Sequence, residues 1–180
     1  ALQSGRQLIW RPFSFVSSPA MHSLEFLAVL VPDGLFTNQL KQSEAGDTLW
    51  IEHENYGFMT EDRFLGGKHL WMLATGTGIG AFISILRDAR VWSRYEQIIV
   101  VHGVRKFEDL VYRAELALLS SEKALQSGQA KLTVIDCVTD RNNTTIENSV
   151  SKSLPVIERD STLLRMRMSR AWDEGLLEKA

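Results

Sequence analysis

The most constraining feature of the sequence is a glycine-rich turn between an apolar run and a helix-forming run. Residues His69–Ala74 are almost uniformly apolar, and residues 75–80 read Thr-Gly-Thr-Gly-Ile-Gly. Ala81–Arg90 then has the composition of a helix. Glycines permit a tight turn and close approach to a ligand, and the start of a helix favours an anion such as a pyrophosphate. A turn that only packs a strand against a helix has the same pattern, so both interpretations stay open.

The alternation of strand and helix continues after this turn. Gln97–Val101 and Lys131–Val138 are expected to be strands, and Phe107–Leu125 a helix. This order predicts a parallel sheet with crossover helices. Ligands of such sheets bind beyond the carboxyl ends of the strands, so Arg105 is a candidate phosphate contact. A solvated arginine beside Lys106 is the alternative.

The residues before the glycine turn are typical of short strands separated by turns. Turn signals occur at 32–34 (Pro-Asp-Gly) and 45–47 (Ala-Gly-Asp). Strands are expected at Gln7–Trp10, Phe13–Val16, Leu24–Val31 and Thr48–Glu54, and a short helix at Phe36–Gln42. Short strands at this spacing favour a small antiparallel sheet or barrel. We place a domain boundary near Leu65–Lys68.

The last forty residues are harder to interpret. Ile146–Ser153 has the composition of a short helix. Within Ser161–Lys179 the leucine, methionine and tryptophan residues recur at roughly helical spacing. We therefore expect a second helix there.

Composition excludes several classes of function. The 180 residues are 44% hydrophobic and 23% charged, with a formal net charge of −2, so the overall charge indicates no nucleic-acid partner. No apolar run approaches the length of a membrane span. Cys137 is the single cysteine and is expected to be a small buried hydrophobe; the histidines show no metal-ligand spacing. We expect a cytoplasmic protein with no membrane partner and no metal; nothing in the sequence indicates its oligomeric state.

A second candidate motif lies near the start of the sequence. Arg11, Phe13 and Ser14 fall along an expected strand, where Arg11 and Phe13 share one face. Arginine suits a phosphate, an aromatic ring suits stacking on a flat heterocycle, and a hydroxyl can bond a ring nitrogen. The alternative is one face of an ordinary strand.

Taken in order, these segments resemble the bacterial ferredoxin/flavodoxin–NADP reductase family. Residues 11–14 (Arg-Pro-Phe-Ser) look like its Arg-x-Tyr-Ser flavin motif, and residues 45–47 look like its Pro-Gly-Asp turn. The run from His69 to Phe82 is similar to the first strand and loop of its nicotinamide domain, and Val100–Arg105 to the next strand. The likeness extends from about Leu8 to Thr139.

The resemblance implies a mixed fold with two domains. Residues 1–66 would form a partial antiparallel β-barrel that binds FAD. Residues 67–180 would form an α/β nicotinamide-binding domain with a parallel sheet, the tail from about residue 140 being unplaced. The implied function is a flavin-dependent oxidoreductase that passes electrons between NADPH and ferredoxin or flavodoxin through FAD. The cofactors are then FAD and NADP.

The resemblance also assigns roles to matched positions. Ser14 would be the catalytic residue beside the flavin N5, with Arg11 on the flavin pyrophosphate and Phe13 against its ring. Thr77 would lie where flavin and nicotinamide meet, and Arg105 would contact the 2′-phosphate of NADP. The further cofactor-binding residues implied are Pro12, Ala28, Val29, Leu30, Leu35, Phe36, Thr37, Val104, Thr139 and Arg141.

The sequence departs from the family pattern at several points. Phe13 replaces a tyrosine, Ala81 replaces a proline, and an arginine expected just after the third strand is displaced to Arg141, with Asp140 at the matched position. An aspartate there repels a phosphate. Further barrel strands and a later Cys-Gly-Asn-Pro segment are not found in this sequence. Two alternatives therefore remain: a truncated or degenerate relative that binds a nucleotide or a partner without turnover, and a protein-interaction module.

Overall fold

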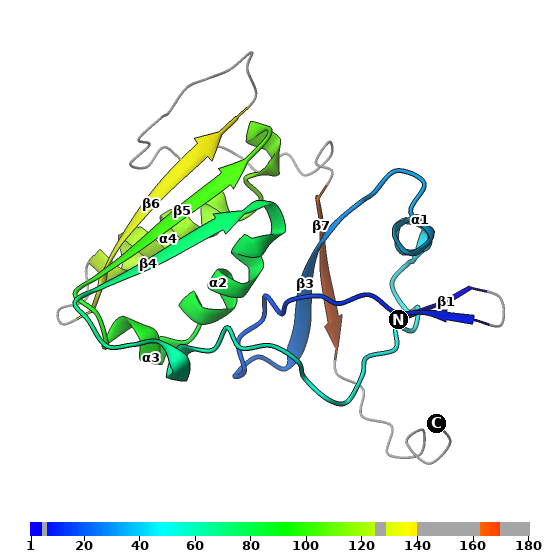
Figure 1. Ribbon diagram of the computed structural model, residues 1–180, viewed down its shortest axis with the longest axis horizontal. Helices are drawn as coiled ribbons and strands as arrows, with labels where there is room; N and C mark the ends of the chain where they lie inside the picture. The colour runs from blue at the N-terminus through cyan, green and yellow to red at the C-terminus, as the bar shows by residue number, and fades with distance from the viewer. Residues whose placement is uncertain (5–6, 125–128, 140–162, 170–180) are drawn as a thin grey trace.

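The structure is a computed structural model that describes residues 1–4, 7–124, 129–139 and 163–169. A three-stranded parallel sheet with its helices lies to one side, and the strands of the first half lie to the other (Figure 1). The prediction of a parallel sheet after the glycine turn is confirmed. The boundary at residues 66 and 67 stays a prediction.

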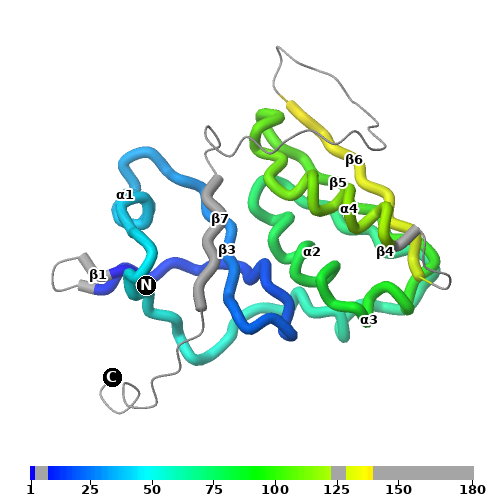
Figure 2. Tube along the Cα trace, turned by 180° about the vertical axis from the view of Figure 1, so that it is seen from behind, coloured from blue at the N-terminus to red at the C-terminus, as the bar shows by residue number. Residues whose placement is uncertain are grey.

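The parallel sheet has the strand order β4–β5–β6. Its strands are β4 (His69–Thr75), β5 (Gln97–Val104) and β6 (Lys131–Val138). The connecting helices are α2 (Ile79–Leu86), α3 (Ala89–Trp92) and α4 (Arg113–Ala124), with short 3-10 turns at Gly76–Gly78 and Phe107–Asp109. The helices lie in front of the strands when the molecule is seen from behind (Figure 2). Successive strands joined by right-handed crossovers place their helices on one face.

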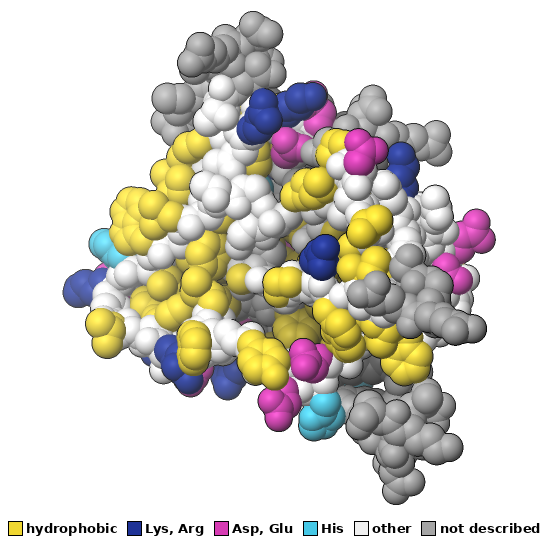
Figure 3. Space-filling model, turned by 45° about the vertical axis from the view of Figure 1, so that its right-hand side comes forward, with side chains coloured by type: hydrophobic (Ala, Val, Ile, Leu, Met, Phe, Trp, Pro, Cys, Tyr) yellow, Lys and Arg dark blue, Asp and Glu magenta, His cyan; other side chains and the backbone are white. Residues whose placement is uncertain are grey.

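Successive side chains of β4 point to opposite faces of the sheet, and only one of these faces is buried. Met72 and Ala74 point toward the helices and are buried, whereas Trp71 is 57% and Leu73 69% exposed. The main core lies between the sheet and the helices and includes Ile83 and Trp92. Apolar side chains are also gathered in broad patches on the outer surface (Figure 3).

The first half contains less regular structure. It has β1 (Leu2–Ser4), β2 (Gln7–Ile9), β3 (Ser23–Val29), α1 (Leu35–Gln42) and a 3-10 turn at Glu61–Arg63. β1 and β2 pair antiparallel, and β3 pairs antiparallel with β7 (Leu163–Ser169). The partial barrel stays a prediction, because the described strands of this half form only these two pairs.

Several sequence predictions are corrected. Phe13–Val16 is not a strand but contributes only an isolated bridge between Phe15 and Phe26. Thr48–Glu54 is not a half-buried strand; it has no regular structure and is almost wholly exposed, because no neighbouring strand pairs with it among the described residues. The helix predicted over Ala81–Arg90 starts earlier and breaks at Arg87 and Asp88, where the Asp88 carboxylate accepts from the Arg90 N–H and caps α3.

The helix predicted over Ser161–Lys179 is also wrong within the part of that range that the structure describes. Leu163–Ser169 is a strand that pairs along the whole of β3, with Ser23 opposite Ser169 and Val29 opposite Leu163. Its sequence, Leu-Leu-Arg-Met-Arg-Met-Ser, alternates apolar and basic residues with a period of two, which is the pattern of a strand. The helix predicted over Ile146–Ser153 lies outside the described residues. No helix in the described part of the chain is long and apolar enough to cross a membrane.

Candidate functional site

The glycine loop joins the carboxyl end of β4 to the start of α2. Gly76 has φ +50, a conformation that favours glycine, and an added Cβ at Gly76 or Gly78 would meet no atom within 4 Å. The space above this part of the loop is therefore open to a ligand. Gly80 differs, because its Cβ would lie 2.9 Å from Val16 Cγ2. The packing interpretation of the glycines holds for Gly80.

A buried histidine supports this loop from β5. His102 is 2% exposed, and its Nε2 lies 2.9 Å from the carbonyl oxygen of Gly76, to which it donates because a carbonyl only accepts. Burial lowers the pKa of His102, against the opposing effects of the Gly76 carbonyl, Asp136 and Asp109. The sequence indicated that His102 is a packed residue, but not that it holds the loop; the position of its strand beside β4 could have suggested this.

Asp136 lies on β6 opposite His102. Burial raises the pKa of this carboxyl group, and the charges of Arg113 and His102 oppose that effect. Arg113 Nε lies 3.3 Å from Asp136 Oδ2. The cluster connects the start of α4 to the sheet directly beneath the loop.

The carboxyl ends of β5 and β6 bring further predicted residues to the same edge. The backbone N–H and the hydroxyl of Thr139 both donate to the Val104 carbonyl oxygen, at 3.0 and 3.3 Å. Arg105 is exposed, as is its neighbour Lys106, and no described residue forms an ion pair with Arg105. Val104 is buried, so it acts by packing. Arg141 lies outside the described residues.

The residues expected to face a flavin are divided between core and surface. Phe13 is half-buried, and its ring centroid lies 6.2 Å from that of Phe26 and 5.5 Å from that of Phe36. Arg11 and Ser14 are exposed, and the Arg11 guanidinium donates to the Trp10 carbonyl at 2.7 Å. A cation and a hydroxyl therefore remain accessible beside an aromatic surface.

The other expected residues lie at the end of β3 and the start of α1. Thr37 Oγ1 lies 2.8 Å from the Val31 carbonyl oxygen and 3.2 Å from that of Gly34, so its hydroxyl holds the turn before the helix. The remaining positions separate by burial: Ala28 and Phe36 are buried, Leu30 and Thr77 are half-buried, and Pro12, Val29 and Leu35 are exposed.

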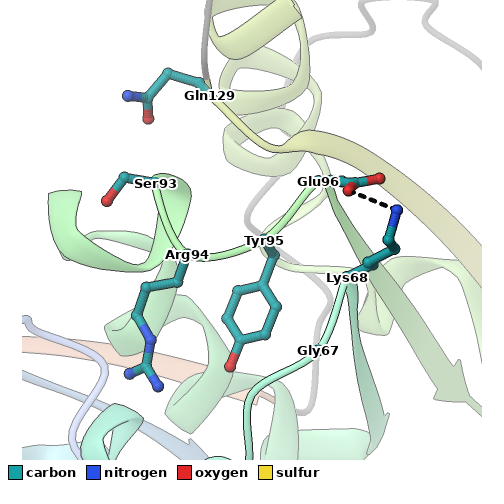
Figure 4. Close-up of a pocket in the computed structure, with 7 residues that line it drawn as sticks. All are labelled: Gly67, Lys68, Ser93, Arg94, Tyr95, Glu96 and Gln129. Carbon is teal, nitrogen blue, oxygen red and sulfur yellow. Dashed lines mark ion pairs between the residues drawn. The ribbon is translucent and has the colours of Figure 1, made fainter.

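A hollow of about 490 Å³ lies at the opposite, amino end of the sheet (Figure 4). Its rim carries Lys68, whose Nζ lies 3.1 Å from Glu96 Oε1, and Arg94, which pairs with Glu61. Because these charges are already paired and the glycine loop is at the other end, the hollow is not part of the candidate site. No cluster of potential metal ligands occurs within the described ranges.

One polar cluster was not predicted from the sequence. Arg87, at the end of α2, forms ion pairs with Glu25 of β3 and Glu115 of α4. The signal that could have found it is a glutamate inside the apolar run of residues 24–31, since a buried carboxylate requires a partner.

Comparisons with known proteins agree with this arrangement. The family model described as the oxidoreductase NAD-binding domain matches residues 72–160. Ferredoxin–NADP reductase of Pseudomonas aeruginosa is 41% identical over 108 residues, which are 60% of this chain and 42% of the relative. Flavodoxin/ferredoxin–NADP reductase of Buchnera aphidicola is 35% identical over 159 residues, 88% of this chain and 58% of the relative.

A solved structure extends the likeness to three dimensions. The crystal structure of a ferredoxin NADP+ reductase from Neisseria gonorrhoeae, with bound FAD and NADP, matches with a TM-score of 0.70 and 30% identity. The match covers 82% of this chain and 57% of that one. The chain is similar to ferredoxin/flavodoxin–NADP reductases in both sequence and fold. It spans about half the length of the reductases that it matches.

Proposed function

We propose that this chain contributes a flavin-facing surface and a nicotinamide-binding domain to a reductase that passes electrons between NADPH and ferredoxin or flavodoxin. The observation that carries the proposal is the gathering of the open glycine loop, Arg105 and Thr139 at the carboxyl edge of one parallel sheet. In sheets of this kind, nucleotides bind at that edge. The division into a partial flavin barrel over residues 1–66 and a nicotinamide domain over 67–180 is part of the proposal.

The nucleotide side of the site fits NADP in its chemistry. The open space above Gly76 and Gly78 lets a pyrophosphate approach the backbone N–H groups at the start of α2. Arg105 is exposed and carries a planar fork of donors that suits the 2′-phosphate. Thr77, between the glycines, would face the nicotinamide.

The flavin side fits FAD through exposed groups of matching chemistry. Arg11 would hold the pyrophosphate and Ser14 would bond the N5 region, while Phe13 would present an aromatic edge from its cluster with Phe26 and Phe36. Leu35, 71% exposed, would cover the cofactor from α1. FAD supplies the exchange between a two-electron hydride donor and a one-electron acceptor. The chain's own residues bind it, orient it and exclude water from it.

The first experiment is the absorbance spectrum of the purified protein with FAD, followed by NADPH addition without oxygen. Flavin bands that bleach on NADPH addition support the proposal. Bands that persist unchanged contradict electron transfer from NADPH, and failure to retain FAD contradicts the flavin site.

Substitution of Arg105 tests the nucleotide side separately. Arg105→Ala should weaken NADPH binding by about 1–3 kcal/mol, the range for a charge-assisted hydrogen bond, and leave NADH binding nearly unchanged. Lys106→Ala, which removes the neighbouring exposed cation, is the matched control and should affect NADPH much less. Equal losses for NADPH and NADH in Arg105→Ala would contradict its role at the 2′-phosphate.

A further inference from the structure

One face of α2 lies against the first half of the molecule along its whole length. Gly80, Ser84 and Arg87 have the spacing of a single helix face. The added Cβ of Gly80 would touch Val16, the Ser84 hydroxyl donates to the Ser17 carbonyl at 2.8 Å, and Arg87 Nη1 donates to the Val16 carbonyl at 3.0 Å. The helix that begins at the glycine loop is therefore fixed to residues 16 and 17.

Arg87 is the strongest of these attachments. Its Nε and Nη2 lie 2.7 and 2.9 Å from the two carboxylate oxygens of Glu115, and its Nη1 lies 3.0 Å from Glu25 Oε2. The Glu25 side chain is fully buried and also accepts from the Tyr112 hydroxyl at 2.9 Å. Burial disfavours the charged form of Arg87, but the hydrogen bonds to Glu115 and Glu25 outweigh it and raise the arginine pKa above its ordinary value.

Glu25 extends this attachment to residues 16 and 17, which follow the residues expected to face the flavin. Its carbonyl accepts from the Val16 N–H at 2.8 Å, and its own N–H donates to the Ser17 hydroxyl at 3.2 Å. Ser14 is two residues before Val16, and Thr77 is two residues before the start of α2. The two segments expected to present the flavin and the nicotinamide are thus held to each other through α2, whose far end lies about 12 Å from its start.

We propose that Arg87 is a positioning residue that fixes the position of the glycine loop relative to residues 13 and 14. The proposal rests on the proposed function. The transfer concerned moves one hydride, with both electrons of its bond, from NADPH to FAD and leaves NADP+. Its rate depends on the relative placement of the two sites, whereas each binding step depends on one site alone. Lysine does not reproduce the contacts of Arg87, because its ammonium has three donors on one nitrogen, whereas the guanidinium makes a bidentate contact with Glu115 and further contacts with Glu25 and the Val16 carbonyl.

The test compares Arg87→Lys with Arg90→Lys in the full chain. Arg90 is also an arginine paired with a carboxylate, but its side chain is exposed and its partner Asp88 belongs to the same short segment. Arg87→Lys should lower the hydride-transfer rate about 10- to 100-fold, the scale of a small misplacement, while the Kd values for FAD and for NADP+ change little. Amide hydrogen exchange at Val16, measured without cofactors, should become faster. Arg90→Lys should change none of these.

Three outcomes would count against the positioning role. These are an unchanged transfer rate, a Kd that rises as much as the rate falls, and unchanged exchange at Val16. If Arg87→Lys does not fold, the double variant Arg87→Met with Glu25→Gln removes both buried charges and should show the same slow transfer with intact binding. Failure of the unsubstituted protein to reduce FAD would instead contradict the proposed function, and the exchange at Val16 separates the two cases.

Discussion

The two halves of the molecule differ in how far they form their own core. The parallel sheet and its helices enclose a large apolar cluster that contains Trp92 and Ile83. The first half has a separate, smaller cluster built from Leu2, Ala28, Phe36 and Leu40. Segment 44–60 of that half is almost entirely exposed, with Tyr56 76% and Phe58 75% accessible. The half with the parallel sheet is therefore stabilised largely by its own packing, whereas the first half, which contributes Val16 and Leu27 to the large cluster, depends more on its attachment to the other half.

The largest expected effect comes from breaking that attachment. Arg87→Met removes the guanidinium that pairs with the fully buried carboxylate of Glu25, which should lower the free energy of unfolding by about 3–5 kcal/mol. Adding Glu25→Gln should recover part of the loss, because the buried charge itself is removed. Urea unfolding followed by circular dichroism measures both. A loss below about 1 kcal/mol in Arg87→Met would show that the halves do not depend on this contact.

Two adjacent residues of β4 test the self-contained core. Met72 is fully buried against the helices, whereas Leu73 is 69% exposed on the opposite face. Met72→Ala should lower the free energy of unfolding by about 2–5 kcal/mol, and Leu73→Ala by at most about 0.5 kcal/mol. Thermal unfolding of the two variants compares them directly. Similar losses in both would mean that the outer face of β4 is also packed.

Glycine substitutions probe the contact between α2 and the first half. Gly80→Ala introduces a Cβ 2.9 Å from Val16 Cγ2, and the resulting shift should cost about 1–3 kcal/mol. Gly78→Ala meets nothing within 4 Å and has φ −58, so it should be neutral or slightly stabilising in the protein without ligand. The two midpoints of thermal unfolding give the comparison. Equal midpoints would indicate that α2 is not closely docked on Val16.

The smallest effect concerns pH and the buried His102. Its pKa is lowered in the folded state by burial, so the unfolded chain binds more protons between the two pKa values. Stability should therefore fall as pH decreases from about 6.5. The contribution of Asp136 to stability has the opposite dependence on pH. Because the pKa of its carboxyl group is raised in the folded state, the folded state binds more protons, and this contribution falls as pH rises through the acid range. Subtracting the pH profile of His102→Gln from that of the unsubstituted protein isolates the histidine; a flat difference would contradict its burial in neutral form.

The accuracy of the sequence predictions follows the same division. Lys131–Val138 was predicted to the residue, because its leucine, valine and isoleucine residues give it the largely apolar, β-branched composition of a strand between polar flanking segments. Thr48–Glu54 has the alternation of a strand, but its Trp50 N–H donates to the Ala1 carbonyl at 3.0 Å and no described strand pairs with the segment. A strand requires a neighbouring strand to satisfy its backbone groups. Local pattern alone cannot supply that neighbour.

For the candidate site, the sequence located segments but not contacts. The glycine loop was predicted because its motif lies between an apolar strand and a helix, and Arg105 because it follows the carboxyl end of the next strand. The bond from His102 to Gly76 and the Arg87–Glu25 pair join residues far apart in the sequence, so no local spacing encodes them. The roles of Arg11, Phe13 and Ser14 stay predictions.

The pairing of β3 with β7 has a consequence for how the chain folds. Ser23 and Ser169 face each other across this pair, whereas β4, β5 and β6 meet neighbours that are much closer in sequence. Closing a long loop costs more entropy and slows the contacts that depend on it. During synthesis the parallel sheet should therefore assemble first, and β3 should wait for residues 163–169 to leave the ribosome. Pulse-labelled exchange during refolding should find β5 amides protected before those of β3; simultaneous protection would contradict this order.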